Sequence, residues 1–341
     1  MTDTSAPAPD ISVVLPAYNT ERYLERAVRS ALDQQGVALE VVIVDDASSD
    51  GTAAVAARLA AEDPRVTLAP NPVNRGCGGS RNAGALAARG RWIALLDADD
   101  AFAPGRLRRL LDIAEREDLD AVADLLLLYD LTAQELGDTQ LEADGRFEVL
   151  TPRSLLDSAV NPDAKLNYGL LKPLYRRELV VQGRWLYPEH ARHGADFLGF
   201  LDTLVAGLRY GLLHEAHYVF STRIGEKSGA WSSGSVTPVN YRAIAANTHE
   251  WIEKYRREAP DIPGLPLEEL LAMLETRAEA CLKMNRNYGW RTFWTRAWPR
   301  HLAWLRSDPR NPPLLARMAV ERLLGGRWLH RFGLRRPEAP R

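Results

Sequence analysis

The chain has 341 residues, of which 46% are hydrophobic and 26% charged, and its formal net charge is −2. This balance is typical of a globular protein with a sizeable core, and it excludes wholesale disorder, a collagen-like repeat and, with only two cysteines, a disulfide scaffold. The small net charge hides an asymmetry, because segment 283–341 carries 14 basic residues against three acidic ones.

No apolar run approaches the roughly 20 residues that a membrane-spanning helix needs. Residues 1–10 lack the basic segment followed by an apolar one that marks a signal peptide, so we expect them to form a short disordered leader. Since nothing calls for an oxidising compartment either, the sequence predicts a cytoplasmic protein.

Strand and helix patterns alternate through the first 130 residues. Short apolar runs predict strands at 11–15, 39–44, 66–68, 92–96 and 121–128. Apolar residues at helical spacing predict helices at 21–34, 52–61, 81–89 and 104–117. This alternation predicts an α/β fold with a mostly parallel sheet flanked by helices.

The pattern is looser beyond residue 130. Turn signals occur at 136–138 and 143–145, a helix is predicted at 197–213, and an extended segment at 217–222. From residue 240 the chain is predicted to be helical, so 240–341 forms a helical, basic and Trp-rich C-terminal region.

Four polar segments follow predicted strands, and in an open parallel sheet ligands bind outside the carboxyl ends of the strands. Together they carry an aromatic side chain, clustered carboxylates, glycines and arginines, and they span residues 16–19, 45–52, 74–82 and 97–100. We expect them to meet at one rim of the sheet. Such a set suits a nucleotide with a metal-bound pyrophosphate.

Each segment also has a structural interpretation. Asp97 and Asp99 directly follow a buried run, where unpaired carboxylates are costly unless they bind something, so a metal site competes with a turn or a helix cap. Asp46 is expected to face a ligand, while Asp50 or Thr52 caps the next helix.

The glycine-rich segment and Tyr18 leave similar choices open. Glycines at 76, 78 and 79 allow close backbone approach to a phosphate, with a helix that starts near Ser80 pointing at it, or they form an ordinary loop. Tyr18 stacks on a base or packs against the protein. The G-x-G-x-x-G fingerprint is absent after the first strand, and G-x-x-x-x-G-K-[ST] is absent throughout, which argues against dehydrogenases and P-loop proteins.

The ordered motifs resemble those of the family 2 glycosyltransferases, which have the GT-A fold. They are I-S-V-V-L-P-A-Y-N, V-I-V-D-D-A-S-S-D-G-T, N-R-G-C-G-G-S-R-N-x-G and L-L-D-A-D-D, followed by K-P-L-Y-R-R-E and H-G-A-D-F. The resemblance covers roughly residues 10–225. It implies a catalytic domain at 11–235, with a nucleotide-binding half at 11–130 and an acceptor half at 131–235.

The same resemblance implies an inverting transferase that uses a nucleotide-diphosphate sugar, with UDP the commonest nucleotide, and Mg²⁺ or Mn²⁺. It implies donor-binding roles for Pro16, Ala17, Tyr18, Asn19, Asp46, Arg81 and Asp97. In these roles Tyr18 would stack on the base and Asp46 would hydrogen-bond its edge. Arg81 would lie near the diphosphate and Asp97 near the ribose.

Asp99 would coordinate the metal, and Asp196 would be the catalytic base. Many relatives have a Glu-Asp pair at the latter position, whereas this chain has Ala195 before Asp196, so the acceptor subsite is expected to differ. Histidines 190 and 193 are candidates for lining that subsite, and His214 or His217 for a further metal ligand, although structural roles compete for each.

The resemblance leaves the acceptor open between a glycan, a lipid-linked glycan and a small natural product. The alternatives are a nucleotide-sugar-binding or scaffold protein that has lost catalysis and a sugar-nucleotide pyrophosphorylase, whose G-x-G-x-R segment is missing after the first strand.

Tryptophans recur among arginines near the C-terminus, at 290, 294, 298, 304 and 328. They either pack on the catalytic domain or a second subunit, or dock on anionic lipid at the inner face of the membrane. No motif supports nucleic-acid binding.

Overall fold

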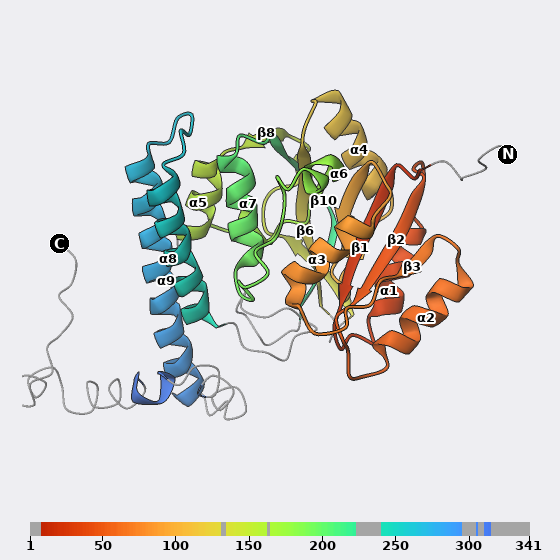
Figure 1. The fold of residues 1–341 in the computed structure, drawn as a ribbon, viewed down its shortest axis with the longest axis horizontal. Coiled ribbons are helices and arrows are strands. Elements are labelled where there is room, and N and C mark those ends of the chain that lie inside the picture. Colours follow the sequence, from red (N-terminus) through yellow and green to blue (C-terminus); the bar gives the residue numbers. More distant parts are fainter. Residues whose placement is uncertain are drawn as a thin grey trace, which may run out of the picture.

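The structure is a computed structural model that describes residues 8–130, 134–161, 164–222, 240–294, 305 and 310–314. Its centre is one mixed sheet (Figure 1). The strands are β1 Ile11–Ala17, β2 Leu39–Asp45, β3 Val66–Leu68, β4 Trp92–Leu95, β5 Ala101–Phe102, β6 Ala121–Asp130, β7 Glu135–Thr139, β8 Phe147–Leu150, β9 Leu174–Arg176 and β10 Tyr210–Thr222. Their order is β3-β2-β1-β4-β9-β6-β10-β5, with β7 beside β6 and β8 beside β10.

Helices pack around the sheet, and further helices lie at one side of the molecule (Figure 1). They are α1 Leu24–Leu32, α2 Thr52–Glu62, α3 Gly76–Ala87, α4 Arg106–Arg116, α5 Pro152–Val160, α6 Arg177–Val181, α7 Ala195–Val205, α8 Tyr241–Glu258 and α9 Leu267–Trp294, with the 3₁₀ turn η1 at Tyr168–Leu170. The predicted α/β fold with a helical C-terminal region is confirmed.

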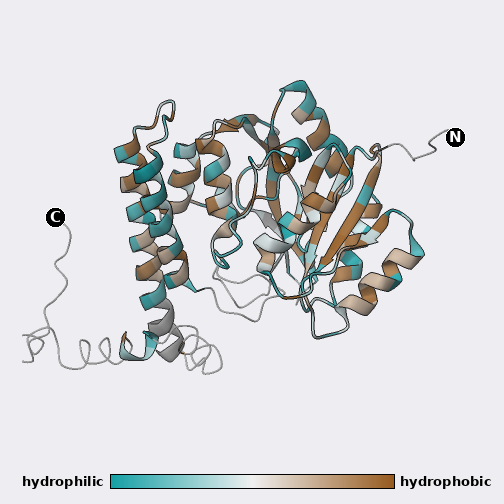
Figure 2. Ribbon diagram, viewed as in Figure 1, coloured by the Kyte–Doolittle hydropathy of each residue, from teal (hydrophilic) through white to brown (hydrophobic). Residues whose placement is uncertain are grey.

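The N-terminal half of the sheet is parallel. β1 pairs in parallel with both β2 and β4, and β2 pairs in parallel with β3. Every residue of β2 is buried, as expected for a strand covered on both faces. Figure 2 shows β1 and β2 as apolar ribbons among more polar helices and loops. The carboxyl ends of these strands therefore share one rim.

The second half of the sheet is mixed. β9 lies between β4 and β6 and runs antiparallel to both, whereas β6 and β10 are parallel. Residues 136–138, expected to turn, instead belong to β7, which pairs with β6 through Leu136 opposite Tyr129. Pairing with the half-buried end of β6 outweighs the local Gly137 turn signal.

The helix predicted at 197–213 was wrong at its C-terminal end. α7 ends at Val205, and residues 210–213 begin β10. Gly207 has a φ of +77°, a left-handed conformation that ends helices, and its N–H bonds to the Leu204 carbonyl. The apolar run after it pairs with β6, so burial in the sheet takes over from helical spacing.

α8 and α9 form a helical pair beside α5 and α7, clearly visible at one side of the molecule in Figure 1. Asp202 of α7 accepts hydrogen bonds from Trp251 Nε1, Lys254 Nζ and Tyr255 Oη of α8, at 3.0, 2.8 and 2.6 Å. An ion pair between Arg153 of α5 and Glu269 of α9 adds a second link. The pair is thus docked on the domain by α5 and α7.

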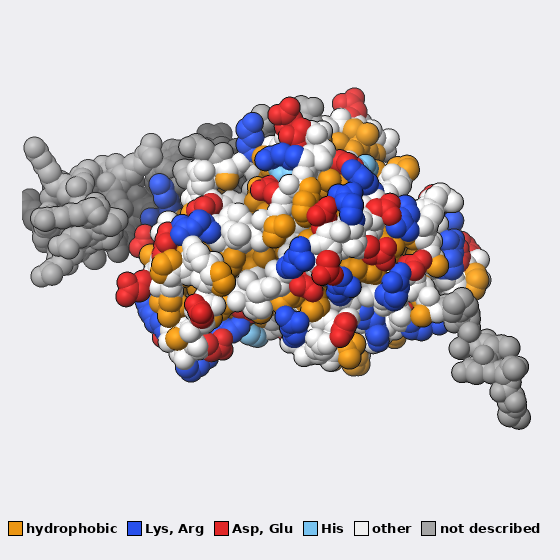
Figure 3. Space-filling view, turned by 90° about the horizontal axis from the view of Figure 1, so that it is seen from above, with side chains coloured by type: hydrophobic (Ala, Val, Ile, Leu, Met, Phe, Trp, Pro, Cys, Tyr) orange, Lys and Arg blue, Asp and Glu red, His pale blue; other side chains and the backbone are white. Residues whose placement is uncertain are grey.

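Figure 3 shows basic and acidic side chains interspersed on one face of the molecule. Many form exposed ion pairs, such as Arg29 with Glu25, and each such pair contributes little because water screens it. Among the described residues, no helix is both long and apolar enough to cross a membrane. The C-terminal tryptophan stripe lies outside the described side chains. Of the expected leader 1–10, residues 1–7 are not described, while the Asp10 N–H already bonds to the Ala38 carbonyl.

Candidate active site

The first site element is the N-terminus of α3, which meets the end of β2. The Asp46 carboxylate is buried and accepts hydrogen bonds from Asn71 Nδ2 and from the backbone N–H groups of Arg75 and Gly76, each at 2.8 Å. Asp46 thus holds the start of α3 against the sheet. A carboxylate offers about four acceptor positions, so one is left for a ligand, and the predicted contact with a base edge stays a prediction.

The start of the helix at the glycine-rich segment differs from the sequence prediction. The helix starts at Gly76 rather than near Ser80, so Gly78 and Gly79 lie inside α3. A Cβ on Gly78 would stand 3.2 Å from the Tyr187 Cβ and 3.4 Å from the Pro188 carbonyl oxygen. The glycine therefore serves close packing between α3 and the loop before α7, where the sequence suggested approach to a phosphate.

The loop after β1 lies beside the loop after β2. Asn19 has a φ of 52°, its N–H donates to Ser48 Oγ at 3.1 Å, and its Oδ1 accepts from the Ser49 N–H at 2.8 Å. The Ala17 carbonyl accepts a backbone bond from the Asp46 N–H, and Ala17 is the last residue of β1 that pairs with β2, directly after Pro16 opposite Val44. Tyr18 is 50% exposed, so its ring is available to stack on a ligand, and that role stays a prediction.

The centre of the site is a ring of four charged side chains. Arg81 of α3 pairs with Asp97 at 2.7 Å and with Asp196 of α7. Lys172, just before β9, lies 3.3 Å from Asp97 Oδ2 and 3.4 Å from Asp196 Oδ2. The structure thus brings together three predicted site residues, Arg81, Asp97 and Asp196, and adds Lys172.

The ring keeps its carboxylates ionised. Burial alone would raise the pKa of Asp196, but the charges of Arg81 and Lys172 outweigh it and leave that pKa below its usual value. The same two cations lower the pKa of Asp97 against the effect of burial. At neutral pH Asp196 is therefore a carboxylate able to accept a proton.

Asp97, Asp99 and Asp100 form the acidic turn after β4. Asp100 accepts hydrogen bonds from Tyr218 Oη and the Ser221 N–H, both at 2.8 Å. Burial, and then the neighbouring charges of Asp99 and Asp97, raise the pKa of Asp100 well above its usual value. The carboxylates of this turn thus repel one another, and a cation beside Asp99 would relieve that repulsion.

The loop before α7 is tied to α3 from several directions. Asn82 Nδ2 donates to the Tyr187 carbonyl at 2.9 Å, and Arg75 pairs with Glu189 at 2.6 Å. Ala195, the residue that replaces the common Glu, is buried, and a Cβ on Gly78 would stand 3.8 Å from its Cβ. A small side chain therefore sits where the start of α7 approaches α3.

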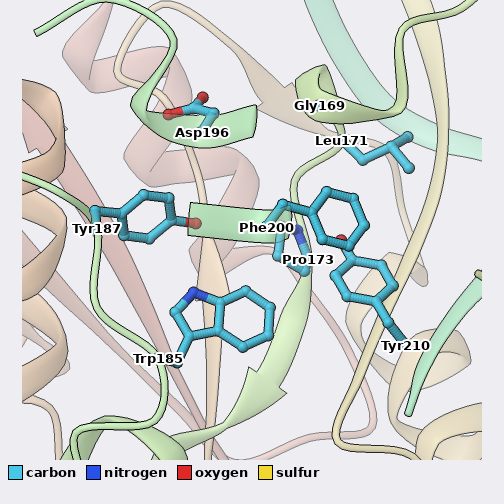
Figure 4. Close-up of a pocket in the computed structure, with 8 residues that line it drawn as sticks. All are labelled: Gly169, Leu171, Pro173, Trp185, Tyr187, Asp196, Phe200 and Tyr210. Atoms are coloured by element: carbon cyan, nitrogen blue, oxygen red, sulfur yellow. The ribbon is translucent and has the colours of Figure 1, made fainter. Parts of the chain in front are cut away.

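Below Asp196 is a small pocket lined by aromatic and other apolar residues (Figure 4). Its lining comprises Gly169, Leu171, Pro173, Trp185, Tyr187, Asp196, Phe200 and Tyr210. Phe200 of α7 stacks on Tyr210 of β10 with ring centroids 4.0 Å apart, which packs α7 against the sheet. Asp196 is the one charged residue in this lining.

The histidines have structural contacts. His190 stacks on Trp251 and pairs with Glu250, and the His193 carbonyl accepts from Asn247. His214 is buried against Glu148. Within the part of the chain that the structure describes, no group of three or more His, Cys, Asp or Glu could hold a metal ion by itself. A histidine as further metal ligand is therefore not supported.

Sequence reasoning missed the roles of Lys172 and Tyr218. Lys172 opens the quoted K-P-L-Y-R-R-E motif, which could have drawn attention to it, but the motif alone gives the lysine no partner. Tyr218 holds the acidic turn, because its hydroxyl donates to Asp100 and accepts from the Asp97 N–H at 3.1 Å. No local signal distinguishes Tyr218 from the other apolar residues of β10.

The fold and site together define an α/β protein with a charged site at the carboxyl ends of a parallel half-sheet. Residues 12–167 match the family model described as Glycosyl transferase family 2. These residues belong to that family, and the fold is the GT-A fold.

Relatives and solved structures agree with this membership. Succinoglycan biosynthesis protein ExoO of Rhizobium meliloti is 38% identical over 220 residues, which cover 64% of this chain and 63% of that protein. Succinoglycan biosynthesis protein ExoU of the same organism is 32% identical, covering 67% and 66%. The chain thus spans slightly less than two thirds of either relative. The crystal structure of S. aureus TarS 1-349 in complex with UDP-GlcNAc superposes with a TM-score of 0.60 at 18% identity, covering 89% of this chain and 83% of that one.

Proposed function

We propose that the chain is an inverting glycosyltransferase that moves a sugar from a UDP-sugar to an acceptor hydroxyl. The observation that carries the proposal is the ionised Asp196 carboxylate, held by Arg81 and Lys172 at the rim where the polar loops after β1, β2 and β4 meet. The match to the family model and the similarity to TarS, whose crystal structures contain UDP and UDP-GlcNAc, support the choice of donor.

In the proposed reaction Asp196 accepts the proton of the acceptor hydroxyl as its oxygen attacks the anomeric carbon. The new glycosidic bond forms on the face opposite the leaving group, and the bond to the diphosphate oxygen breaks with its electron pair. One displacement inverts the anomeric centre, so no second carboxylate nucleophile is needed. Tyr18 and Asp46 would bind the uracil and Asp97 the ribose, with Pro16, Ala17 and Asn19 shaping the loop around them.

The acidic turn fits a divalent cation, because carboxylate oxygens are the donors that Mg²⁺ and Mn²⁺ favour, and the charges of Asp97 and Asp99 lie close enough to Asp100 to raise its pKa. Asp99 is the residue we assign to hold it. A bound cation would supply charge neutralisation for the departing nucleoside diphosphate.

Both relatives are named for succinoglycan biosynthesis, which supports a glycan as the acceptor class. We further propose a cytoplasmic location at or near the inner face of the membrane, with the C-terminal region as the segment for membrane contact or self-association.

The test is a panel of UDP-, GDP- and TDP-sugars incubated with the protein and Mn²⁺, with release of the nucleoside diphosphate as readout. We expect turnover with at least one UDP-sugar and an inverted anomeric configuration in the product. Binding of UDP without turnover of any donor, across acceptors that include glycans and lipid-linked glycans, would favour the non-catalytic alternative.

A further inference from the structure

Lys172 is placed where two functional carboxylates meet. It lies between η1 and β9, and its side chain is only 4% exposed. Its Nζ lies 3.3 Å from Asp97 Oδ2 and 3.4 Å from Asp196 Oδ2. A buried ammonium needs compensation, and these two carboxylates supply it from different parts of the fold. One lysine therefore links the acidic turn after β4 to the start of α7.

The second cation of the ring has a different geometry. Arg81 donates through Nη2 to Asp97 Oδ1 and through Nη1 to Asp196 Oδ1. Each carboxylate thus has one oxygen on the guanidinium and the other on the ammonium. Without Lys172, each would keep one ionic contact and could turn about its Cβ–Cγ bond. Two anchors fix the carboxylate plane, whereas one does not.

The ring also balances its charge, with two positive and two negative groups. The charges of Asp97 and Asp196 raise the pKa of Lys172 despite its burial, so the ammonium persists at neutral pH. The groups that face Asp196 from neighbouring elements are the charged side chains of Arg81, Lys172 and Asp97 and the neutral side chains of Cys77 and Tyr187. Removing the lysine would leave one cation for two carboxylates.

We infer that Lys172 is a positioning residue of the active site, whose ammonium, together with the Arg81 guanidinium, holds the Asp196 carboxylate in one orientation for its role as base. The inference rests on the proposed function, because it assigns Lys172 a role through the base of that reaction. Lys172 does not touch the reacting atoms, and it acts through Asp196.

The experiment compares the pH profile of kcat/KM for the full chain with those of Lys172→Met, Lys172→Arg and Lys165→Met. A base must be ionised, so the rate falls as the pH drops through its pKa, and loss of a nearby cation raises that pKa by about 1–3 units. We expect Lys172→Met to move the acid limb upward by about 1–2 pH units and to lower the rate at pH 7 about tenfold. Lys172→Arg should restore most of both.

Lys165 is the matched control, since it is exposed and seven residues away in the same connection. Lys165→Met should reproduce the unaltered profile. The inference would be overturned if the acid limb of the Lys172→Met profile stays at its original pH. It would also be overturned if Lys172→Met loses the same factor in rate at every pH and Lys172→Arg does not restore that rate. Absence of turnover in the unaltered chain would instead count against the proposed function.

A measurement that needs no turnover tests the role of Lys172 independently of the proposed transferase activity. It also remains possible if a variant is poorly stable. The ¹³C signal of the Asp196 carboxyl, assigned with Asp196→Asn, gives its pKa in the unaltered chain and in Lys172→Arg and Lys172→Met. The inference requires a higher Asp196 pKa in Lys172→Met than in the other two proteins. If Lys172→Met fails to fold, Lys172→Gln replaces it in both measurements, and an unshifted Asp196 pKa in that variant would likewise refute the role.

Discussion

Replacing Asp46 with alanine should lower the free energy of unfolding of the protein even in the absence of a ligand. Its carboxylate accepts three hydrogen bonds of 2.8 Å and is 3% exposed, so Asp46→Ala leaves Asn71 Nδ2 and the N–H groups of Arg75 and Gly76 short of partners. Loss of a helix N-terminal acceptor costs roughly 0.5–2 kcal/mol, and an unsatisfied buried donor about 1–3 kcal/mol. The two backbone N–H groups are only partly buried, so we expect a total loss of about 2–4 kcal/mol, inside the range of about 1.5–5 kcal/mol to which these two terms sum.

Urea unfolding followed by far-UV circular dichroism measures this loss directly. Asp45→Ala is the matched control, since the neighbouring Asp45 accepts one long bond, from the Ser48 N–H at 3.4 Å, and should lose less than about 1 kcal/mol. Equal losses in the two variants would refute the idea that Asp46 anchors α3.

Three further predictions concern the donor pocket, the metal and the helical pair. Tyr18→Ala should weaken UDP binding by about 1–3 kcal/mol in calorimetry with no change in unfolding midpoint, because the ring is half exposed; unchanged affinity would remove Tyr18 from the base site. Asp99→Ala should abolish transfer and weaken binding of UDP in the presence of Mn²⁺, and EDTA should have the same effect on the unaltered chain; full activity in EDTA would contradict metal dependence. Asp202→Ala removes the acceptor for Trp251, Lys254 and Tyr255 and should cost about 1–3 kcal/mol, with hydrogen exchange faster in α8; unaltered exchange there would show that apolar packing alone docks the pair.

Local sequence patterns predicted the parallel half of the sheet well. Apolar runs such as 39–44, interrupted only by Glu40, are typical of a strand buried on both faces, and β2 occupies 39–45. Because parallel strands end at one rim, the convergence of Asp46, Arg81 and Asp97 also followed from sequence.

Tertiary context decided the features that local patterns missed. The 197–213 run is apolar at both helix and strand spacing, and only pairing with β6 and the left-handed Gly207 divide it. The glycines at 78 and 79 gave a loop signal, but the close packing of Gly78 depends on Tyr187, more than 100 residues away. Likewise, Lys172 acquires a partner only when the start of α7 and the turn after β4 come together.

The proposed role of Asp196 as base is tested most directly by Asp196→Asn, measured by single-turnover transfer with an active UDP-sugar. Asn keeps the shape but cannot accept the proton, so transfer should slow by about 10²–10⁴-fold. UDP affinity should be unchanged or higher, because a negative charge leaves the ring. Asp157→Asn, at an exposed position of α5, is the control and should transfer at the unaltered rate. Transfer by Asp196→Asn at close to the unaltered rate would contradict Asp196 as the base.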